Sequence, residues 1–221
     1  YSEEETEGEG DDAVTKMVNK SEQINAATAL WTVAKSELKK EDYVEFYKTI
    51  SHGDNEPLVH LHNKVEGSNE FTTLFYIPKT APMDMYRTDY EAGVKLYVKR
   101  VFITDDNKEL LPPYLRFVKG IIDSEDLPLN VSRELLQENR ILANIKQNST
   151  KKILQAIKKL SAEEAETFTA QYNRVMKEGV YIDHTNKELL LDIVKYKSST
   201  EEGLVSFEDY VSRGNSEKKE I

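Results

Sequence analysis

The spacing of hydrophobic and polar positions changes along the chain and predicts where helices and strands lie. Between residues 24 and 50 the apolar positions follow a helical period. Residues 24–33 form one such run around Trp31, which we expect to lie in the core. Glu37–Thr49 predicts an amphipathic helix. Its apolar stripe, more typical of a core than of a ligand site, consists of Tyr43, Phe46, Tyr47 and Ile50.

From Pro57 onwards the period becomes that of strands. Apolar and polar residues alternate after Pro57, and β-rich runs follow over Glu70–Ile77 and Val94–Thr104. Their near-continuous apolarity predicts a sheet that is covered on both faces. Leu110–Gly120 predicts a short helix that ends at Gly120, and Ile121–Ile122 a short buried strand.

After residue 130 the pattern is helical again. Ser132 can cap a helix, and residues 139–160 predict a second one. Ser161–Glu164 is a capping box that begins a helix ending at Gly179, and Thr185–Glu188 is another box before an apolar run.

Acidic residues gather at the start of the chain. The net charge is -10, and seven acidic residues lie within residues 1–12, where two glycines interrupt them. Like charges repel one another and bury no apolar surface. This composition predicts a disordered acidic linker over residues 1–20.

These patterns together predict an α/β protein. We expect an α-β-α layered sheet domain over residues 21–135, followed by a helical coil segment that forms a small bundle over residues 136–213. Residues 214–221 form a charged end.

Composition excludes several classes of protein. The chain has no cysteine, so disulfides, thiolate metal sites and cysteine nucleophiles are excluded. No apolar run approaches the roughly 20 residues that span a bilayer, and no signal-peptide pattern opens the chain. We therefore expect a cytoplasmic protein. Because the chain begins at Tyr1, we expect a piece of a longer one.

Two groups of residues leave alternatives open. His60 and His62 share one face of a strand, but no third ligand lies at a recognisable spacing, so strand histidines are favoured over a metal site. The long segment 78–93 carries Met83, Met85 and Tyr86. It either forms an adaptable apolar contact surface or folds back over the sheet.

The segment Asp123–Gln137 carries the most specific signal. If Ser132 caps a helix, Arg133 takes the first helical position, where a cation opposes the helix macrodipole. Arg133 then either pairs with a local carboxylate or awaits an anion from outside the chain. Spacing alone favours the salt bridge, with three candidate acceptors: Asp123, Glu125 and Asp126.

The chain lacks a phosphate cradle of its own. Neither G-x-x-x-x-G-K-[ST] nor G-x-G-x-x-G occurs. A phosphate bound by Arg133 would therefore be held by another domain, which is the geometry of an arginine finger. A second cationic feature, the basic stretch 139–160, is read as a solvated helix face in preference to a nucleic-acid site.

A series of motifs, in the same order, resembles the middle domain of the heat-shock protein 90 family, and in detail its bacterial branch. The resemblance covers residues 20–213. The motifs are Ala29–Trp31, Glu45–Lys48, Val65–Gly67, Phe75–Pro78, Ala81–Pro82, Lys95–Ile103, Tyr114–Gly120 and Asp123–Gln137.

The resemblance implies a dimeric, ATP-driven molecular chaperone of the stress response. ATP with Mg would be held by an N-terminal domain outside this chain. Arg133 matches the arginine that reaches the γ-phosphate, Gln137 the glutamine that supports it, and Asn130 a nearby loop asparagine. The family resemblance thus favours the external anion for Arg133. The longer protein would hydrolyse ATP, and this segment alone would be inactive.

The resemblance also implies partners. Phe102 matches a position that helps to dock the N-terminal domain, and Met83, Met85 and Tyr86 match a loop that contacts unfolded or partly folded clients. We expect the longer protein to form a homodimer through a C-terminal domain, and this segment, which precedes a second, smaller α/β unit, to be a monomer. Neither nucleic acid nor a membrane is expected as a partner. The alternative is a non-enzymatic scaffold in which Arg133 forms a structural salt bridge.

Overall fold

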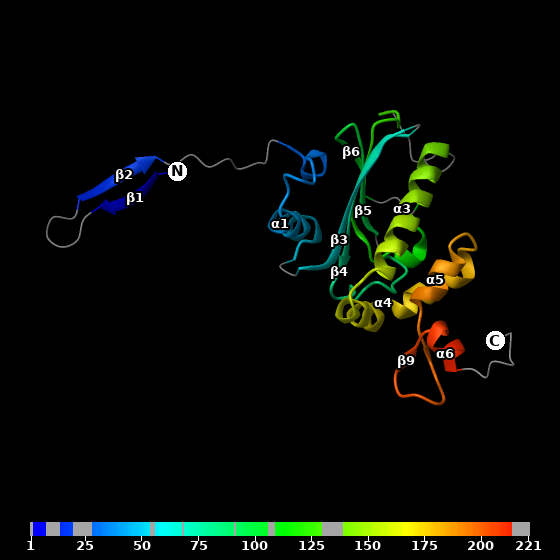
Figure 1. Ribbon diagram of the computed structural model, residues 1–221. Coiled ribbons are helices and arrows are strands. Elements are labelled where there is room, and N and C mark those ends of the chain that lie inside the picture. Colours follow the sequence, from blue (N-terminus) through cyan, green and yellow to red (C-terminus); the bar gives the residue numbers. More distant parts are fainter. Residues whose placement is uncertain are drawn as a thin grey trace.

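A mixed five-stranded sheet with helices on both faces forms the centre of the molecule (Figure 1). The computed structural model describes residues 2–7, 14–19, 28–53, 56–67, 69–90, 92–105, 109–129 and 139–213. The strand order is β3-β4-β7-β5-β6, with β5 and β7 parallel and the other pairs antiparallel. The predicted α-β-α layering is confirmed. The strands are β3 (Pro57–Val65), β4 (Phe71–Pro78), β5 (Gly93–Val98), β6 (Val101–Thr104) and β7 (Lys119–Ser124).

One face of the sheet is covered by the short 3-10 helix η1 (Leu30–Thr32) and by α1 (Lys40–Ser51). Trp31 is buried as predicted. The helix α1 begins later than expected because the Asp42 carboxylate accepts the Lys39 N–H at 2.7 Å and caps it there. This smaller core comprises Trp31, Tyr43, Tyr47, Leu74, Tyr76 and Ile121.

The opposite face carries three helices, α3 (Arg140–Lys158), α4 (Ala162–Ile182) and α5 (Lys187–Ile193). Ile145 and Ile153 of α3 belong to the same buried cluster as Phe75 of β4 and Ile122 of β7. One core therefore extends across the boundary that was expected between residues 135 and 136. The helix α3 covers this face of the sheet and also packs against α5.

The helix ends agree only in part with the predictions. Asn139 caps α3 by accepting the N–H groups of Ile141 and Leu142, and the Ser161–Glu164 capping box is confirmed. Gly179 does not end α4 but lies inside it, where a Cβ would stand 2.9 Å from the Tyr114 ring. The predicted Thr185–Glu188 box is wrong, because α5 begins at Lys187 without a side-chain cap.

The β-rich run over residues 94–104 is confirmed, but it is divided into β5 and β6 by a turn at which Lys99 and Arg100 take positive φ angles of 50° and 67°. A second prediction for the sheet region is wrong. The expected helix over 110–120 is reduced to one 3-10 turn, η2 (Pro113–Leu115). Gly120 belongs to β7, where its φ of 141° and its contact with the β4 backbone require glycine.

The acidic N-terminal segment contains a hairpin instead of the expected disordered linker. The strand β1 (Ser2–Glu7) pairs with β2 (Val14–Asn19), and Glu5 lies opposite Lys16 in the register. The acidic block alone shows no strand signal, whereas β2, which pairs with β1, lies beyond it and is rich in β-branched residues. Residues 196–213 form β8 (Tyr196–Lys197), β9 (Leu204–Val205) and α6 (Phe207–Arg213).

Candidate functional site

The chain leaves β7 through a firmly held turn. Ser124 Oγ accepts the backbone N–H groups of Asp126 and Leu127 at 3.3 and 3.2 Å. Asp126 Oδ2 accepts the Glu70 N–H at 2.6 Å, and Leu127 is buried. The root of the segment that leads to Arg133 is thus fixed to the sheet as far as residue 127.

The three predicted catalytic residues, Asn130, Arg133 and Gln137, lie outside the described residues. The structure does describe Asp123, one of the three carboxylates considered as salt-bridge partners of Arg133. Asp123 is 4% exposed, and both its carboxylate oxygens accept hydrogen bonds from other groups. Of the three local carboxylates, Asp123 is therefore the least suited to pair with Arg133.

Phe102 lies on an edge strand and is half exposed, as is its neighbour Val101. We call these two residues the edge patch. The Phe102 ring meets Tyr97 edge-on at 5.6 Å, and Tyr97 packs against Trp31 at 4.8 Å. A half-exposed aromatic ring supported from below is suited to contact another protein surface.

The segment that joins β4 to β5 is held by Arg116, a residue that the sequence analysis did not single out. Its guanidinium makes two bonds to Glu178 of α4, at 2.6 and 2.9 Å, and its Nε–H donates to the Met85 carbonyl at 3.0 Å. It also lies 5.4 Å from the centre of the Tyr86 ring. Glu178 raises the pKa of Arg116 by hydrogen bonding. The sequence signal that could have identified Arg116 is its position as a charged residue inside the otherwise apolar turn 114–118.

The segment 78–93 folds back over the sheet at Met85, whereas Met83 and Tyr86 remain exposed. Met85 is 1% exposed and lies in the core, so its assignment to a client-contact surface is corrected: it covers the sheet. Met83 is fully exposed, and Tyr86 is 45% exposed with Arg174 stacked 4.6 Å from its ring. Beside this segment lies a cavity of about 170 Å³, lined largely by apolar residues. Burial raises the pKa of Tyr90 in its wall to about 12.

His60 and His62 are structural strand histidines, as the sequence favoured. His62 Nε2–H donates to the Trp31 carbonyl at 3.1 Å, and Nδ1 lies 3.0 Å from the Tyr43 hydroxyl. The His60 ring stacks on Tyr43 at 4.1 Å. Within the described ranges no group of three His, Cys, Asp or Glu side chains could hold a metal ion.

These histidines predict a loss of stability in mild acid. Burial lowers the pKa of both below 6.5, so the unfolded chain takes up their protons at a higher pH than the folded chain. The free energy of unfolding should therefore fall as the pH drops below 6.5. Urea unfolding at pH 7.5 and 5.5 measures this change. His62→Gln should reduce the difference, and an undiminished difference would contradict the assignment.

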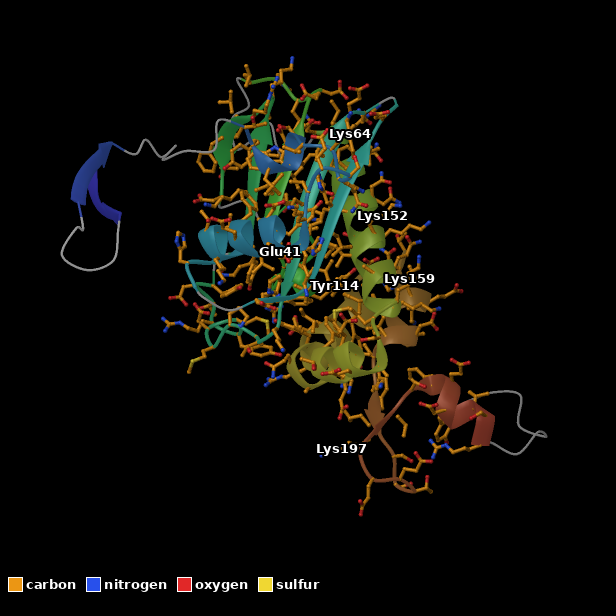
Figure 2. All side chains as sticks on the ribbon, turned by 60° about the vertical axis from the view of Figure 1, so that its left-hand side comes forward. Glu41, Lys64, Tyr114, Lys152, Lys159 and Lys197 are labelled. Carbon is orange, nitrogen blue, oxygen red and sulfur yellow. The ribbon has the colours of Figure 1, made fainter. Side chains whose placement is uncertain are left out.

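The basic face of α3 is partly neutralised by neighbouring helices and turns. Lys158 pairs with Asp192 at 2.6 Å and Lys146 with Glu109 at 3.2 Å. Lys152 and Lys159 extend outwards from the helix (Figure 2). Paired and dispersed lysines agree with the solvated helix face that the sequence favoured.

The fold and the motif order agree with comparisons to known proteins. The Hsp90 protein family model matches residues 1–221. The chain is 80% identical over 221 residues to the chaperone protein HtpG of Sulfurovum sp. (strain NBC37-1) and 65% identical over 222 residues to that of Aliarcobacter butzleri (strain RM4018). These alignments cover 100% and 99% of this chain but 36% and 35% of the relatives.

Among solved structures, the middle domain of a Plasmodium falciparum heat shock protein superposes with a TM-score of 0.73 at 27% identity, covering 86% of this chain and 75% of that one. The fold is thus that of an Hsp90 middle domain. The chain belongs to the Hsp90 protein family, and its curated relatives are bacterial HtpG chaperones, as the motifs predicted.

The chain spans about a third of the length of those relatives. In the part of the chain that the structure describes, none of the helices has the length and apolarity to cross a membrane.

Proposed function

We propose that this chain is the middle segment of an ATP-dependent molecular chaperone and that Arg133 completes the ATPase site of a separate N-terminal domain. The observation that carries the proposal is the fixed root at Ser124–Leu127, six residues before Arg133, in a chain of this family. A rigid base gives a loop side chain a reproducible reach, which transition-state stabilisation requires.

The available groups fit a shared nucleotide site. This chain offers a guanidinium but no glycine-rich phosphate loop and, within the described ranges, no cluster of metal ligands. In this proposal ATP and Mg are held mainly by the other domain. ATP would supply the transferable γ-phosphoryl group. Arg133 would donate N–H groups to its oxygens and stabilise the charge that develops there. Gln137, four residues further along the sequence, would hold the guanidinium in place, and Asn130 would lie at the loop entrance.

The expected partners follow from the exposed surfaces. The edge patch would contact the N-terminal domain, and Met83 with Tyr86 would contact unfolded or partly folded clients beside the apolar cavity. We propose a cytoplasmic protein of the stress response that forms a homodimer through a C-terminal domain. The 221-residue segment would be a monomer without ATPase activity of its own.

Phe102→Ala tests the docking role. Burying a phenylalanine side chain contributes about 1.5–3 kcal/mol, so its loss should lower ATP turnover of the longer protein about tenfold or more. Because Phe102 is half exposed, the free energy of unfolding should change by less than about 1 kcal/mol. Tyr181→Ala is the matched control, since Tyr181 is an exposed aromatic residue at the end of α4. Equal ATP turnover in Phe102→Ala, Tyr181→Ala and the unsubstituted protein would reject the docking role.

A further inference from the structure

Asp123 joins two segments of the chain that are far apart in sequence. It lies on β7 and is 4% exposed, and the two groups that donate to its carboxylate are both neutral. Its Oδ2 accepts the Trp31 indole N–H at 2.8 Å, and its Oδ1 accepts the Arg100 backbone N–H at 3.1 Å. A buried carboxylate is costly to desolvate, and an asparagine or threonine could serve a single bond at lower cost.

The first bond fixes the segment around Trp31. The Trp31 carbonyl accepts a hydrogen bond from His62 of β3, and His62 in turn contacts the Tyr43 hydroxyl of α1. Trp31 therefore ties η1, α1 and β3 to the end of β7.

The second bond fixes the turn that carries the edge patch. Two-residue hairpin turns with positive φ at both positions favour Asn and Gly, yet here they are Lys99 and Arg100. The turn is held from the β7 side, because Asp123 accepts the Arg100 N–H and the Ser124 carbonyl accepts the Lys99 N–H at 3.0 Å. Phe102 follows two residues after Arg100.

We propose that Asp123 is a positioning residue for the ATPase reaction. It locks the segment around Trp31, the hairpin turn beside Phe102 and the root of the Arg133 loop into one unit. Docking of the N-terminal domain on the edge patch then places Arg133 at a set distance from the nucleotide. This role rests on the function proposed above and adds a residue that contacts neither nucleotide nor partner.

Asp123→Asn in the longer protein tests the proposal. The amide keeps one acceptor but turns an N–H₂ group towards the other donor, so one of the two links is lost. Because small displacements of catalytic groups have large effects, we expect kcat for ATP hydrolysis to fall about tenfold or more while the Kd for ATP changes by less than about threefold.

Asp183→Asn is the matched control. Asp183 also accepts several hydrogen bonds, from the Tyr114 hydroxyl at 2.6 Å and from Asn186, but it lies at the end of α4. The Asp183→Asn variant should lower the thermal unfolding temperature, as Asp123→Asn does, but leave kcat unchanged. A purely structural role of Asp123 would give the two variants the same kcat, and that result would overturn the proposal.

Two further variants keep the outcomes distinct. If Asp123→Asn does not fold, Trp31→Phe removes the indole donor while it keeps an aromatic ring at this position. It should lower kcat several-fold, and an unchanged kcat would overturn the proposal. Arg133→Ala reports on the underlying function. A normal kcat in Arg133→Ala would reject that function, whereas a low kcat in Arg133→Ala with a normal kcat in Asp123→Asn would reject the positioning role alone.

Discussion

Arg133→Ala in the longer protein is expected to lower kcat for ATP hydrolysis by about 10²–10⁴-fold. The guanidinium would interact with the γ-phosphoryl group mainly in the docked, reacting state, so its loss should change the Kd for ATP by less than about threefold. Steady-state phosphate release and equilibrium nucleotide binding measure the two quantities separately.

Arg140→Ala is the control for this experiment. Arg140 is an exposed arginine at the first position of α3, only seven residues after Arg133, and should leave both quantities unchanged. A passive scaffold makes a different prediction. If Arg133 only formed a local salt bridge, its removal would lower the free energy of unfolding and leave kcat unaltered.

Gly120→Ala is expected to produce the largest loss of stability in this chain. Gly120 lies in the central strand β7, and a Cβ there would overlap the Leu74 carbonyl oxygen of β4. The neighbouring strand is buried on both faces and cannot move away. With the strain of its φ of 141°, the substitution should lower the free energy of unfolding by about 3–5 kcal/mol.

Gly67→Ala separates the two causes of that loss. Gly67 has nearly the same φ, 144°, but among the described residues no atom lies within 4 Å of the position that a Cβ would take. Alanine at residue 67 should therefore cost only the backbone strain, about 1–2 kcal/mol. Urea unfolding of the two variants measures the difference, and equal losses would show that the contact with Leu74 contributes nothing.

The layered fold could be predicted because its signals are local and repeated. The aromatic stripe of α1 predicts one buried helix face, and the apolar runs of β4 and β7 predict strands buried on both faces. The structure shows this arrangement, because α1 contributes to one core cluster while β4 and β7 contribute to both. The Ser161 capping box worked for the same reason, since it needs only residues three positions apart. Family membership followed from several motifs in a fixed order.

The errors arose where distant residues decide the local backbone. The turn at Lys99–Arg100 has no glycine or asparagine, and its acceptors are Asp123 and Ser124 on another strand. Gly120 was interpreted as a helix stop because its close contact with the β4 backbone involves residues distant in sequence and leaves no local pattern. Met85 and Met83 look alike in sequence, but the anchoring of their segment by Arg116 buries one and exposes the other.

The central claim is that Arg133 stabilises the transferring phosphoryl group of a nucleotide held by another domain. Binding of ADP with aluminium fluoride, which mimics that group during transfer, tests it most directly. We expect Arg133→Ala to weaken this complex in the longer protein by about 100-fold or more while binding of ADP alone is unchanged. Equal affinity of the variant and the unsubstituted protein for ADP with aluminium fluoride would contradict the account.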